Sequence, residues 1–334
     1  MEITEFKKFL STPRQIVITT HHKPDGDALG SSLGFLHILK GMGHKVTVIS
    51  PSDFPSFFDW MPGRGDILLF PESIPEATSL VRNADLICCL DFNHLKRINE
   101  LGELVAESKA VKIMVDHHLD PQGFDDFRFW DTETSSTAEL IYRLAFDLGL
   151  QERITAEVAT CLYTGIMTDT GSFRFPRTTP ALHRIVASLI EAGADNVAIH
   201  ELVYDQYTLS RLHFLGYCLK EKLVVIDELN TAYFAISAEE LDQFTIQTGD
   251  TEGIVNYALA LSGIKLAVLI IQRHDMIKLS FRSTGDFPCN LLANKYFNGG
   301  GHKNASGGMS LDNLPGTIKK FTDALVEFRQ LLVI

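Results

Sequence analysis

The sequence has 334 residues, of which 30 are Lys or Arg and 42 are Asp or Glu, so the formal net charge is −12. With 45% hydrophobic and 22% charged residues the composition is that of a soluble globular protein, which excludes a fibrous chain, a mostly disordered chain and a disulfide mini-protein. The negative charge argues against a general binder of duplex DNA, because contacts with the phosphate backbone need Lys and Arg.

Three further features predict a cytoplasmic protein. No apolar run approaches the roughly 20 residues that are needed to cross a bilayer. The first ten residues, MEITEFKKFL, include acidic residues and lack the apolar core of a signal peptide. The cysteines are odd in number and have no CxxC spacing, as expected in a reducing compartment; they are Cys88, Cys89, Cys161, Cys218 and Cys289.

The first half of the chain alternates apolar runs with helical patterns. We predict strands at 15–20, 45–50, 66–70, 85–90 and 111–115, and helices from Leu29 to Gly41 and over 93–108. The strand runs are apolar throughout, which is typical of strands that are covered on both faces. This alternation predicts an α/β fold with a doubly wound, mainly parallel sheet.

The pattern changes in the second half. Residues 135–200 are predicted to be mostly helical, and 201–220 to form a helical connector. From Leu223 the runs LVVI, TAYFAI, IKLAVLII and MIKLSF predict strands with helices among them. We therefore expect one domain over 1–200, the connector over 201–220 and a smaller α/β domain over 221–334.

Carboxylates and imidazoles follow several of the predicted elements. HHKPDGD follows strand 15–20, Asp91 follows 85–90, DHH follows 111–115, and TDTG follows a helix near 155–167. Ligands of open α/β sheets bind at the carboxyl ends of the strands, so these groups are expected to converge there. Asp and His without thiolate favour Mn²⁺ or a similar ion over a structural zinc site.

The number of carboxylates indicates how many ions the site holds. Asp25, Asp27, Asp91 and Asp169 balance the charge of two divalent ions. A neutral two-metal site can activate a hydroxide for in-line attack on phosphorus, whereas a site with one ion would repel phosphate.

A second candidate site lies in the segment 265–303, which carries six basic and two acidic residues within an acidic chain. Arg282 offers a planar fork to a phosphate, and Ser283 adds a hydroxyl. Gly299, Gly300 and Gly301 allow close approach of the backbone, and His302 can donate to a phosphate oxygen. The segment therefore predicts a binding site for a small anionic ligand.

Together these motifs resemble those of the DHH phosphoesterase superfamily. FRSTGDFPCNLLANKYFNGGGHKNASGG resembles the associated DHHA1 domain, and the resemblance covers roughly residues 10–330. Within the superfamily the chain resembles the nanoRNase/pAp-phosphatase branch. Members of that branch degrade short RNAs and remove the 3′-phosphate from 3′-phosphoadenosine 5′-phosphate (pAp).

The resemblance implies a role for each motif residue. The implied metal ligands are His21 and Asp25 for one ion, Asp27, His117 and Asp169 for the other, and Asp91 as the bridge between them. His118 is implied as a proton donor or charge stabiliser at the phosphate, and Asp116 as the residue that orients the histidines. The implied substrate-binding residues are Arg282, Ser283, Gly299, Gly300, Gly301 and His302.

The function implied by the resemblance is hydrolysis of short single-stranded oligonucleotides or pAp, in a cleft between the two domains. Two divalent ions are expected, Mn²⁺ first, with Mg²⁺ and Co²⁺ as alternatives. Three other functions stay open: a stand-alone phosphodiesterase acting on c-di-AMP or pApA, an exopolyphosphatase, and a non-catalytic nucleotide-binding protein. The ranking of the substrates, the cleavage polarity and a homodimeric state are also left open.

Overall fold

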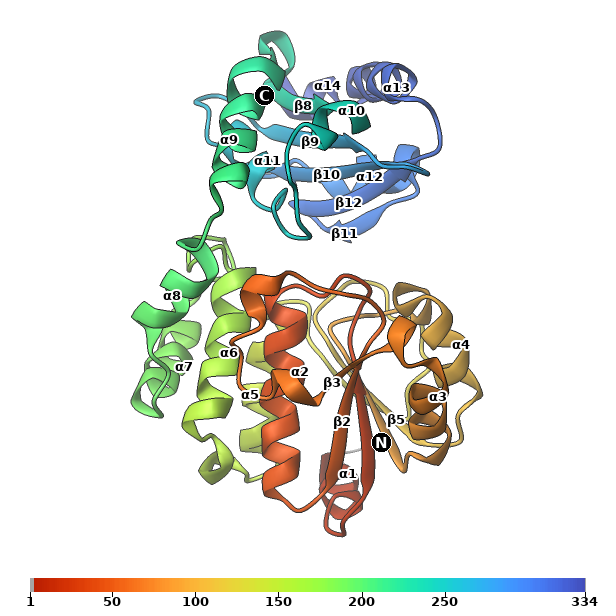
Figure 1. Ribbon diagram of the computed structural model, residues 1–334. Helices are drawn as coiled ribbons and strands as arrows, with labels where there is room; N and C mark the ends of the chain where they lie inside the picture. Colours follow the sequence, from red (N-terminus) through yellow and green to blue (C-terminus); the bar gives the residue numbers. More distant parts are fainter. Residues whose placement is uncertain (1–2, 334) are drawn as a thin grey trace. The chain divides into compact units, whose positions relative to one another are not determined.

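The computed structural model describes residues 3–333, and the chain divides after Gln206 into two compact units (Figure 1). Each unit is built on one six-stranded sheet. Each unit also has its own hydrophobic clusters, and within the described residues no cluster contains residues from both units.

The sheet of the first unit is parallel throughout, with the strand order β3-β2-β1-β4-β5-β6. Its strands are β1 (Gln15–Thr19), β2 (Lys45–Ser50), β3 (Ile67–Leu69), β4 (Leu86–Leu90), β5 (Val111–Asp116) and β6 (Phe127–Trp130). The winding direction reverses between β1 and β4, and the carboxyl ends of such neighbouring strands are where ligands bind in doubly wound sheets. The prediction of a doubly wound, mainly parallel sheet is confirmed.

Helices cover both faces of this sheet, with α2, α5 and α6 on one side and α3 and α4 on the other (Figure 1). Successive residues of β4 enter two different clusters: Cys88 packs with the first group of helices and Cys89 with the second. This two-sided burial explains why the strands are apolar throughout. The helices are α1 (Ile3–Phe9), α2 (Gly26–Gly41), α3 (Ile74–Asn83), α4 (Glu100–Glu107), α5 (Thr137–Asp147), α6 (Ala156–Asp169), α7 (Pro180–Glu191) and α8 (Asn196–Tyr204).

Two elements of the first unit differ from the prediction. The helix predicted over 93–108 is a 3₁₀ helix, η4 (Leu95–Ile98), followed by α4, and Asn99 between them has a positive φ of 50° that no continuous helix allows. Strand β6 was not predicted, because it is a short edge strand of four residues that buries Phe127 and leaves Trp130 exposed. The other short helices of this unit are η1 (Ser56–Phe58), η2 (Arg64–Asp66), η3 (Phe70–Glu72) and η5 (Gln151–Arg153).

The sheet of the second unit is mixed, with the order β11-β12-β10-β9-β8-β7, and only β8 and β9 are parallel to each other. Its strands are β7 (Leu223–Ile226), β8 (Thr231–Ile236), β9 (Leu266–Gln272), β10 (Ile277–Ser283), β11 (Gly300–His302) and β12 (Ala305–Ser310). Its helices are α9 (Leu209–Tyr217), η6 (Cys218–Lys222), η7 (Asp227–Leu229), α10 (Ala238–Asp242), α11 (Ile254–Leu259), α12 (Cys289–Phe297), α13 (Leu314–Glu327) and α14 (Arg329–Val333). The prediction of a smaller α/β domain is confirmed.

Helix α9 lies in the range that the sequence indicates as a connector. Its residue Phe214, together with Cys218, is fully buried in a hydrophobic cluster of the second unit. This helix is therefore part of the second unit.

All five cysteines are buried and unpaired as thiols. Between residues 3 and 333, no helix is both long and apolar enough to span a membrane.

Candidate metal centre

The polar motif residues of the first unit gather at the carboxyl ends of three central strands. His21 comes shortly after β1, Asp91 directly after β4, and His117 directly after β5. The backbone N–H of Asp91 donates to the carbonyl of Val115 at 3.0 Å, which ties the end of β4 to β5. Asp91 has a positive φ of 63°, a conformation that a residue other than glycine adopts rarely and at a cost of roughly 1–3 kcal/mol.

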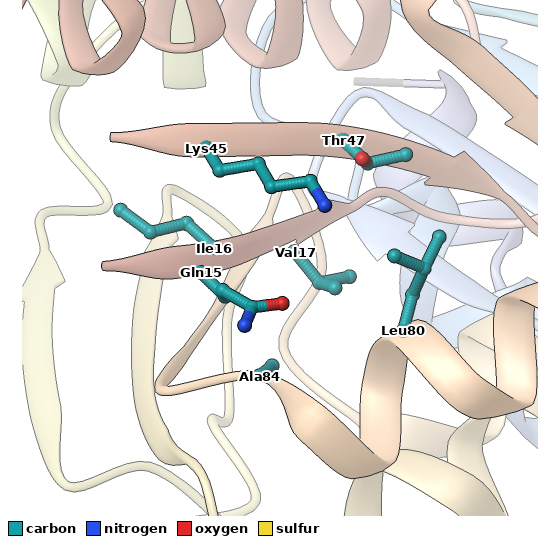
Figure 2. A pocket seen from close by; sticks show the side chains of 7 residues that line it. All are labelled: Gln15, Ile16, Val17, Lys45, Thr47, Leu80 and Ala84. Carbon is teal, nitrogen blue, oxygen red and sulfur yellow. The ribbon is translucent and has the colours of Figure 1, made fainter. Parts of the chain in front are cut away.

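A shallow hollow at the opposite edge of the same sheet carries no such residues. It lies at the first residues of β1 and β2 (Figure 2), and it is lined by Gln15, Ile16, Val17, Lys45, Thr47, Leu80 and Ala84. The hollow has no carboxylate or imidazole, so the chemistry-bearing groups belong to the carboxyl edge.

Close packing of α2 on α6 brings two further carboxylates to this edge. Asp25 caps α2, because its side chain accepts hydrogen bonds from the N–H groups of Asp27 and Ala28 at 3.1 Å each. A Cβ atom on Gly30 of α2 would lie 2.5 Å from the carbonyl oxygen of Cys161 in α6, so only glycine permits this approach. As a result Asp27, in the first turn of α2, lies near Asp169 at the end of α6.

The side chains form two groups that share a boundary at Asp91. The first group is His21, Asp25 and Asp91, and the second is Asp27, His117 and Asp169; within each group the ligand atoms lie within 4.8 Å of one another. Asp91 Oδ2 is 3.4 Å from Nε2 of His21, and Asp91 Oδ1 is 3.5 Å from Nε2 of His117. Each oxygen of Asp91 therefore faces a different group.

The second group is centred on His117. Its Nε2 atom lies 3.5 Å from Oδ2 of Asp169 and 3.8 Å from Oδ2 of Asp27. The side chains of Asp27 and Asp91 are 2% and 3% exposed, whereas those of Asp25 and Asp169 are 50% and 31% exposed. The cluster thus has a buried floor and an accessible rim.

The start of α5 fixes the two buried carboxylates. The backbone N–H of Thr137 donates to Oδ2 of Asp27 at 2.7 Å, and that of Ala138 donates to Oδ1 at 2.8 Å. The hydroxyl of Thr137 donates to Oδ1 of Asp91 at 3.0 Å. A helix N-terminus favours negative charge, so α5 offsets part of the cost of burying the charge of Asp27.

The protein groups alone leave an excess of negative charge at this site. Burial, reinforced by the charges of Asp91 and Asp169, raises the pKa of Asp27 well above its usual value. Burial opposes the charging of His21 and His117, but hydrogen bonds and charges from their carboxylate partners outweigh it and raise the pKa of each imidazole to about 10. A bound cation would relieve this repulsion in place of protons.

The cluster is able to bind divalent metal ions. Carboxylate and imidazole are suitable ligands for such ions, and the described part of the first unit contains three groups of three candidate ligands, the third being Asp91, Asp116 and His118. The charge of the carboxylates and the raised pKa values of the neighbouring groups fit cations rather than a neutral ligand.

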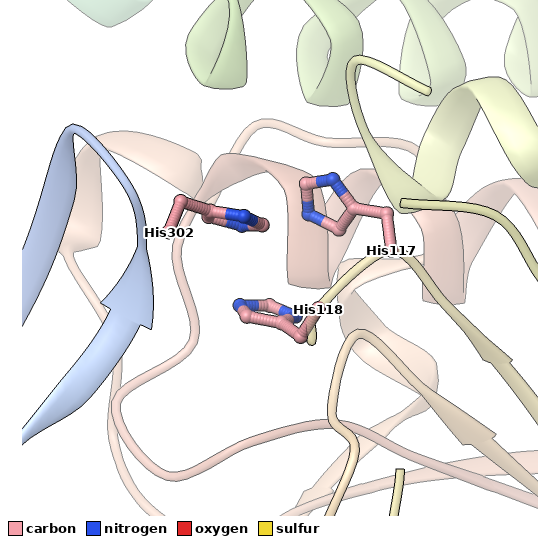
Figure 3. A group of neighbouring side chains, drawn as sticks. All are labelled: His117, His118 and His302. Atoms are coloured by element: carbon pink, nitrogen blue, oxygen red, sulfur yellow. The ribbon is translucent and has the colours of Figure 1, made fainter. Parts of the chain in front are cut away.

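His118 and Asp116 form a pair beside the cluster. Nδ1 of His118 lies 2.7 Å from Oδ1 of Asp116, and the indole N–H of Trp130 donates to the His118 carbonyl at 2.7 Å. Burial, together with the charge of Arg97, lowers the pKa of His118 well below its usual value. Burial, together with the charge of Asp91, raises the pKa of Asp116 to about 6. Figure 3 shows the rings of His117 and His118, which extend from the chain just after β5.

Two family models match the chain. Residues 15–166 match the N-terminal domain of the DHH family, and residues 230–331 match the DHHA1 domain. A relative from Thermus thermophilus, named bifunctional oligoribonuclease and PAP phosphatase NrnA, is 30% identical over 93% of this chain and 89% of its own length. The chain belongs to the DHH family.

Two other similar proteins match this chain over almost its whole length. A Bacillus subtilis protein, also named bifunctional oligoribonuclease and PAP phosphatase NrnA, is 28% identical over 91% of this chain and 92% of its own length. The crystal structure of an exopolyphosphatase-related protein from Bacteroides fragilis has a TM-score of 0.94 and 43% identity, and covers 99% of this chain and 97% of that one. The chain is a hydrolase of the DHH family.

The candidate substrate residues of the DHHA1 domain lie on neighbouring strands. Arg282 on β10 is opposite Ala305 on β12, which is in turn opposite His302 on β11. His302 is the third side chain drawn in Figure 3. The hydroxyl of Ser283 is buried and donates to the carbonyl of Phe287 at 2.7 Å, so it holds a turn of its own domain.

The glycine run has a structural role that the sequence analysis did not identify. Gly300 and Gly301 belong to β11, and a Cβ atom on Gly299 would lie 2.1 Å from the carbonyl oxygen of Gly307. Gly301 has a positive φ of 136°, and its Cβ would lie 2.6 Å from the carbonyl oxygen of Ala305. These two glycines are needed for the close hairpin of β11 and β12, whereas a Cβ on Gly300 would meet nothing.

Sequence reasoning missed two residues that support the centre. Thr137 follows Ser136, the cap of α5, so its place in the sequence is that of an ordinary first-turn residue. Nothing in the local sequence indicates that Thr137 contacts Asp27, which is 110 positions away. Arg97 also escaped notice, because an Arg in a helical pattern is usually a surface residue.

Proposed function

We propose that this DHH-family hydrolase cleaves phosphate esters of short oligoribonucleotides and of pAp. The observation that carries the proposal is the position of Asp91, whose two oxygens face two separate groups of candidate metal ligands. The names of the Thermus and Bacillus relatives supply the substrate class.

We further propose that two divalent ions, Mn²⁺ first, bind at this centre. His21 and Asp25 would hold one, Asp27, His117 and Asp169 the other, and Asp91 would bridge them. Ions at this position supply positive charge to phosphoryl oxygens and lower the pKa of water. Four carboxylates at the centre match the charge of two such ions.

The protein residues orient this centre and handle protons. Thr137, Ala138 and the N-terminus of α5 hold Asp27 and Asp91 before substrate arrives, so little reorganisation is needed during the reaction. Nδ1 of His118 faces Asp116, so we assign proton exchange with the substrate to Nε2 of His118.

We propose that Arg282 and His302 of the DHHA1 domain bind the part of the substrate away from the phosphate that is cleaved. The excess of basic residues over 265–303 supports this role. For Ser283 the internal hydrogen bond argues against a direct contact. The binding of one substrate by both domains stays a prediction.

The name of the Bacteroides structure favours an exopolyphosphatase as a second candidate. Polyphosphate has no nucleobase. A protein that hydrolyses it needs no nucleobase-binding site, whereas a protein that acts on pAp and short RNA can use one. Cleavage of c-di-AMP or pApA by a stand-alone phosphodiesterase is a further alternative that uses the same centre.

The test compares turnover of pAp, short RNA, pApA, c-di-AMP and polyphosphate by the Mn²⁺-loaded protein. We expect turnover of pAp and short RNA, and its loss in Asp91→Asn. The exposed Asp147→Asn serves as a matched control and is expected to keep activity. Hydrolysis of polyphosphate alone would overturn the proposal in favour of the second candidate.

Arg282→Ala is expected to reduce kcat/KM for pAp by roughly 10–100-fold, the scale of a lost charge-assisted contact, but to leave kcat/KM for bis-p-nitrophenyl phosphate unchanged.

A further inference from the structure

The short helix η4 lies between the two loops that carry His21 and His118. The carbonyl of Arg97 in η4 accepts a hydrogen bond from the backbone N–H of His22 at 2.7 Å. On the other side, the N–H of Leu95 donates to Oε1 of Gln122 at 2.9 Å. The N–H of Gln122 in turn donates to the carbonyl of Asn93 at 2.8 Å. The backbone of η4 is thus hydrogen-bonded to the segments that follow both β1 and β5.

Packing against α4 and the hydrophobic core also fixes the position of η4. Ile98 is fully buried, and Gly102 of α4 lies so close that its Cβ would be 2.4 Å from the carbonyl oxygen of Leu95. The backbone of the half-buried Arg97 is therefore fixed by the loop of His22, by the loop of Gln122 and by α4.

Arg97 differs from other basic residues of the first unit. Arg64, Arg128 and Arg143 each form an ion pair with a nearby carboxylate. Within residues 3–333 the guanidinium of Arg97 has no carboxylate within 4.0 Å and donates no hydrogen bond. Its backbone nevertheless lies beside the centre, because the carbonyl of Arg97 accepts the hydrogen bond from His22, the residue next to His21.

A cation held beside this centre without an anionic partner is suited to an anionic ligand. We infer that Arg97 binds a phosphoryl group of the substrate, donating to its non-bridging oxygens at the side of the metal centre where His118 lies. A guanidinium fork matches two phosphate oxygens in one plane. This inference rests on the proposed function and adds a phosphate-binding residue to it.

The test uses inorganic phosphate as the probe, with the Mn²⁺-loaded full chain. We expect Arg97→Ala and Arg97→Gln to weaken phosphate binding about 10–100-fold, the range for a lost hydrogen bond to a charged group, while metal content stays unchanged. Arg97→Lys keeps the charge but loses the fork, so it is expected to recover part of the affinity. The exposed neighbour Lys96→Ala removes a cation from the same turn and is expected to bind phosphate within about twofold of the unmodified chain.

Steady-state kinetics on pAp separates this inference from the proposed function. We expect the Arg97 variants to lose kcat/KM by a factor similar to their loss of phosphate affinity. Unchanged phosphate affinity in Arg97→Ala would overturn the inference, and so would a loss of bound Mn²⁺ in both neutral variants. If the unmodified chain cleaves neither RNA nor pAp, the proposed function fails, and the phosphate titration still decides the role of Arg97.

Discussion

Asp91 and His118 lie side by side but meet the metal centre in different ways. Asp91 points one oxygen at each group of candidate ligands, whereas Nδ1 of His118 is 2.7 Å from Asp116 and 3.7 Å from Asp91. We therefore expect His118→Ala to keep its bound metal and to lose roughly 10²–10⁴ in kcat, the usual scale for a positioned acid–base group. Metal analysis together with turnover of bis-p-nitrophenyl phosphate measures both quantities. Loss of bound metal in this variant would make His118 a ligand instead.

The raised pKa values of His21 and His117 predict that metal binding releases protons. His21 and His117 have pKa values of about 10, so without metal both imidazoles stay protonated at neutral pH. In that state they stabilise the fold fully below pH 6.5, and the contribution is lost as the pH rises through about 10. A ligating imidazole is neutral and a ligating carboxylate is ionised, so binding should release one proton from each imidazole and, because the pKa of Asp27 is raised, the proton of any Asp27 that is still protonated. Mn²⁺ affinity should therefore rise with pH up to about 10.

Calorimetric titration of Mn²⁺ in two buffers of different ionisation enthalpy measures this release directly. The expected heats differ between the buffers by the ionisation enthalpy of at least about two protons. Equal heats in both buffers at neutral pH would show that neither imidazole gives up a proton, and would contradict their assignment as ligands.

At this scale the sequence was informative where motif residues follow predicted strands. His21, Asp91 and His117 were placed at one edge from strand order alone, and the structure brings them together. Thr137 and Arg97 could not be placed in the same way. Their contacts depend on which segments pack together, and strand periodicity does not encode that.

At the scale of elements, the packing of α2 on α6 determines where Asp27 and Asp169 lie. We expect Gly30→Ala to destabilise the first unit by about 1–3 kcal/mol, because the new Cβ would lie 2.5 Å from the backbone oxygen of Cys161 and 2.8 Å from the nitrogen of Gly165. This is the net loss after the roughly 1 kcal/mol that alanine gains in a helix, because both close contacts are to backbone atoms that cannot move aside as the end of a side chain can. Mn²⁺ affinity should fall as well, since α2 must shift and carries Asp27 with it.

Chemical denaturation and metal titration of the same variant provide the measurement. Gly65→Ala is the matched control, because a Cβ there meets nothing within 4 Å, and its stability should change by no more than about 0.5 kcal/mol. Full stability and metal affinity in Gly30→Ala would contradict the view that this contact positions the two carboxylates.

The elements that sequence periodicity missed share a physical reason. Strand β6 is a short edge strand, the break at Asn99 needs a single positive φ, and β11 is formed partly by glycines. In each case backbone pairing or backbone conformation forms the element, and neither produces a period of apolar side chains. Long buried strands such as β4 and β5 were predictable because both of their faces are covered by helices.

At the scale of the whole molecule, the two units have separate hydrophobic clusters, and the six proposed metal ligands all belong to the first. The division into an α/β domain with a parallel sheet and a second α/β domain was predictable from the change of pattern near Leu223. We expect Mn²⁺ to stabilise only the first unit, since a ligand stabilises the part of the chain whose folded state binds it.

The chain offers a probe for this prediction, because its two tryptophans, Trp60 and Trp130, both lie in the first unit. At an Mn²⁺ concentration of about 100 times Kd, each bound ion adds roughly 2.7 kcal/mol, so the Tm of a unit of this size should increase by at least about 5–10 °C. The tryptophan fluorescence transition should rise by that amount and should fail to rise in Asp91→Asn. Calorimetry of the same samples should show a second transition, from the unit without tryptophan, that stays within about 1 °C. An equal shift of two separate transitions would mean that Mn²⁺ also binds the second unit, and would contradict a metal centre confined to the first.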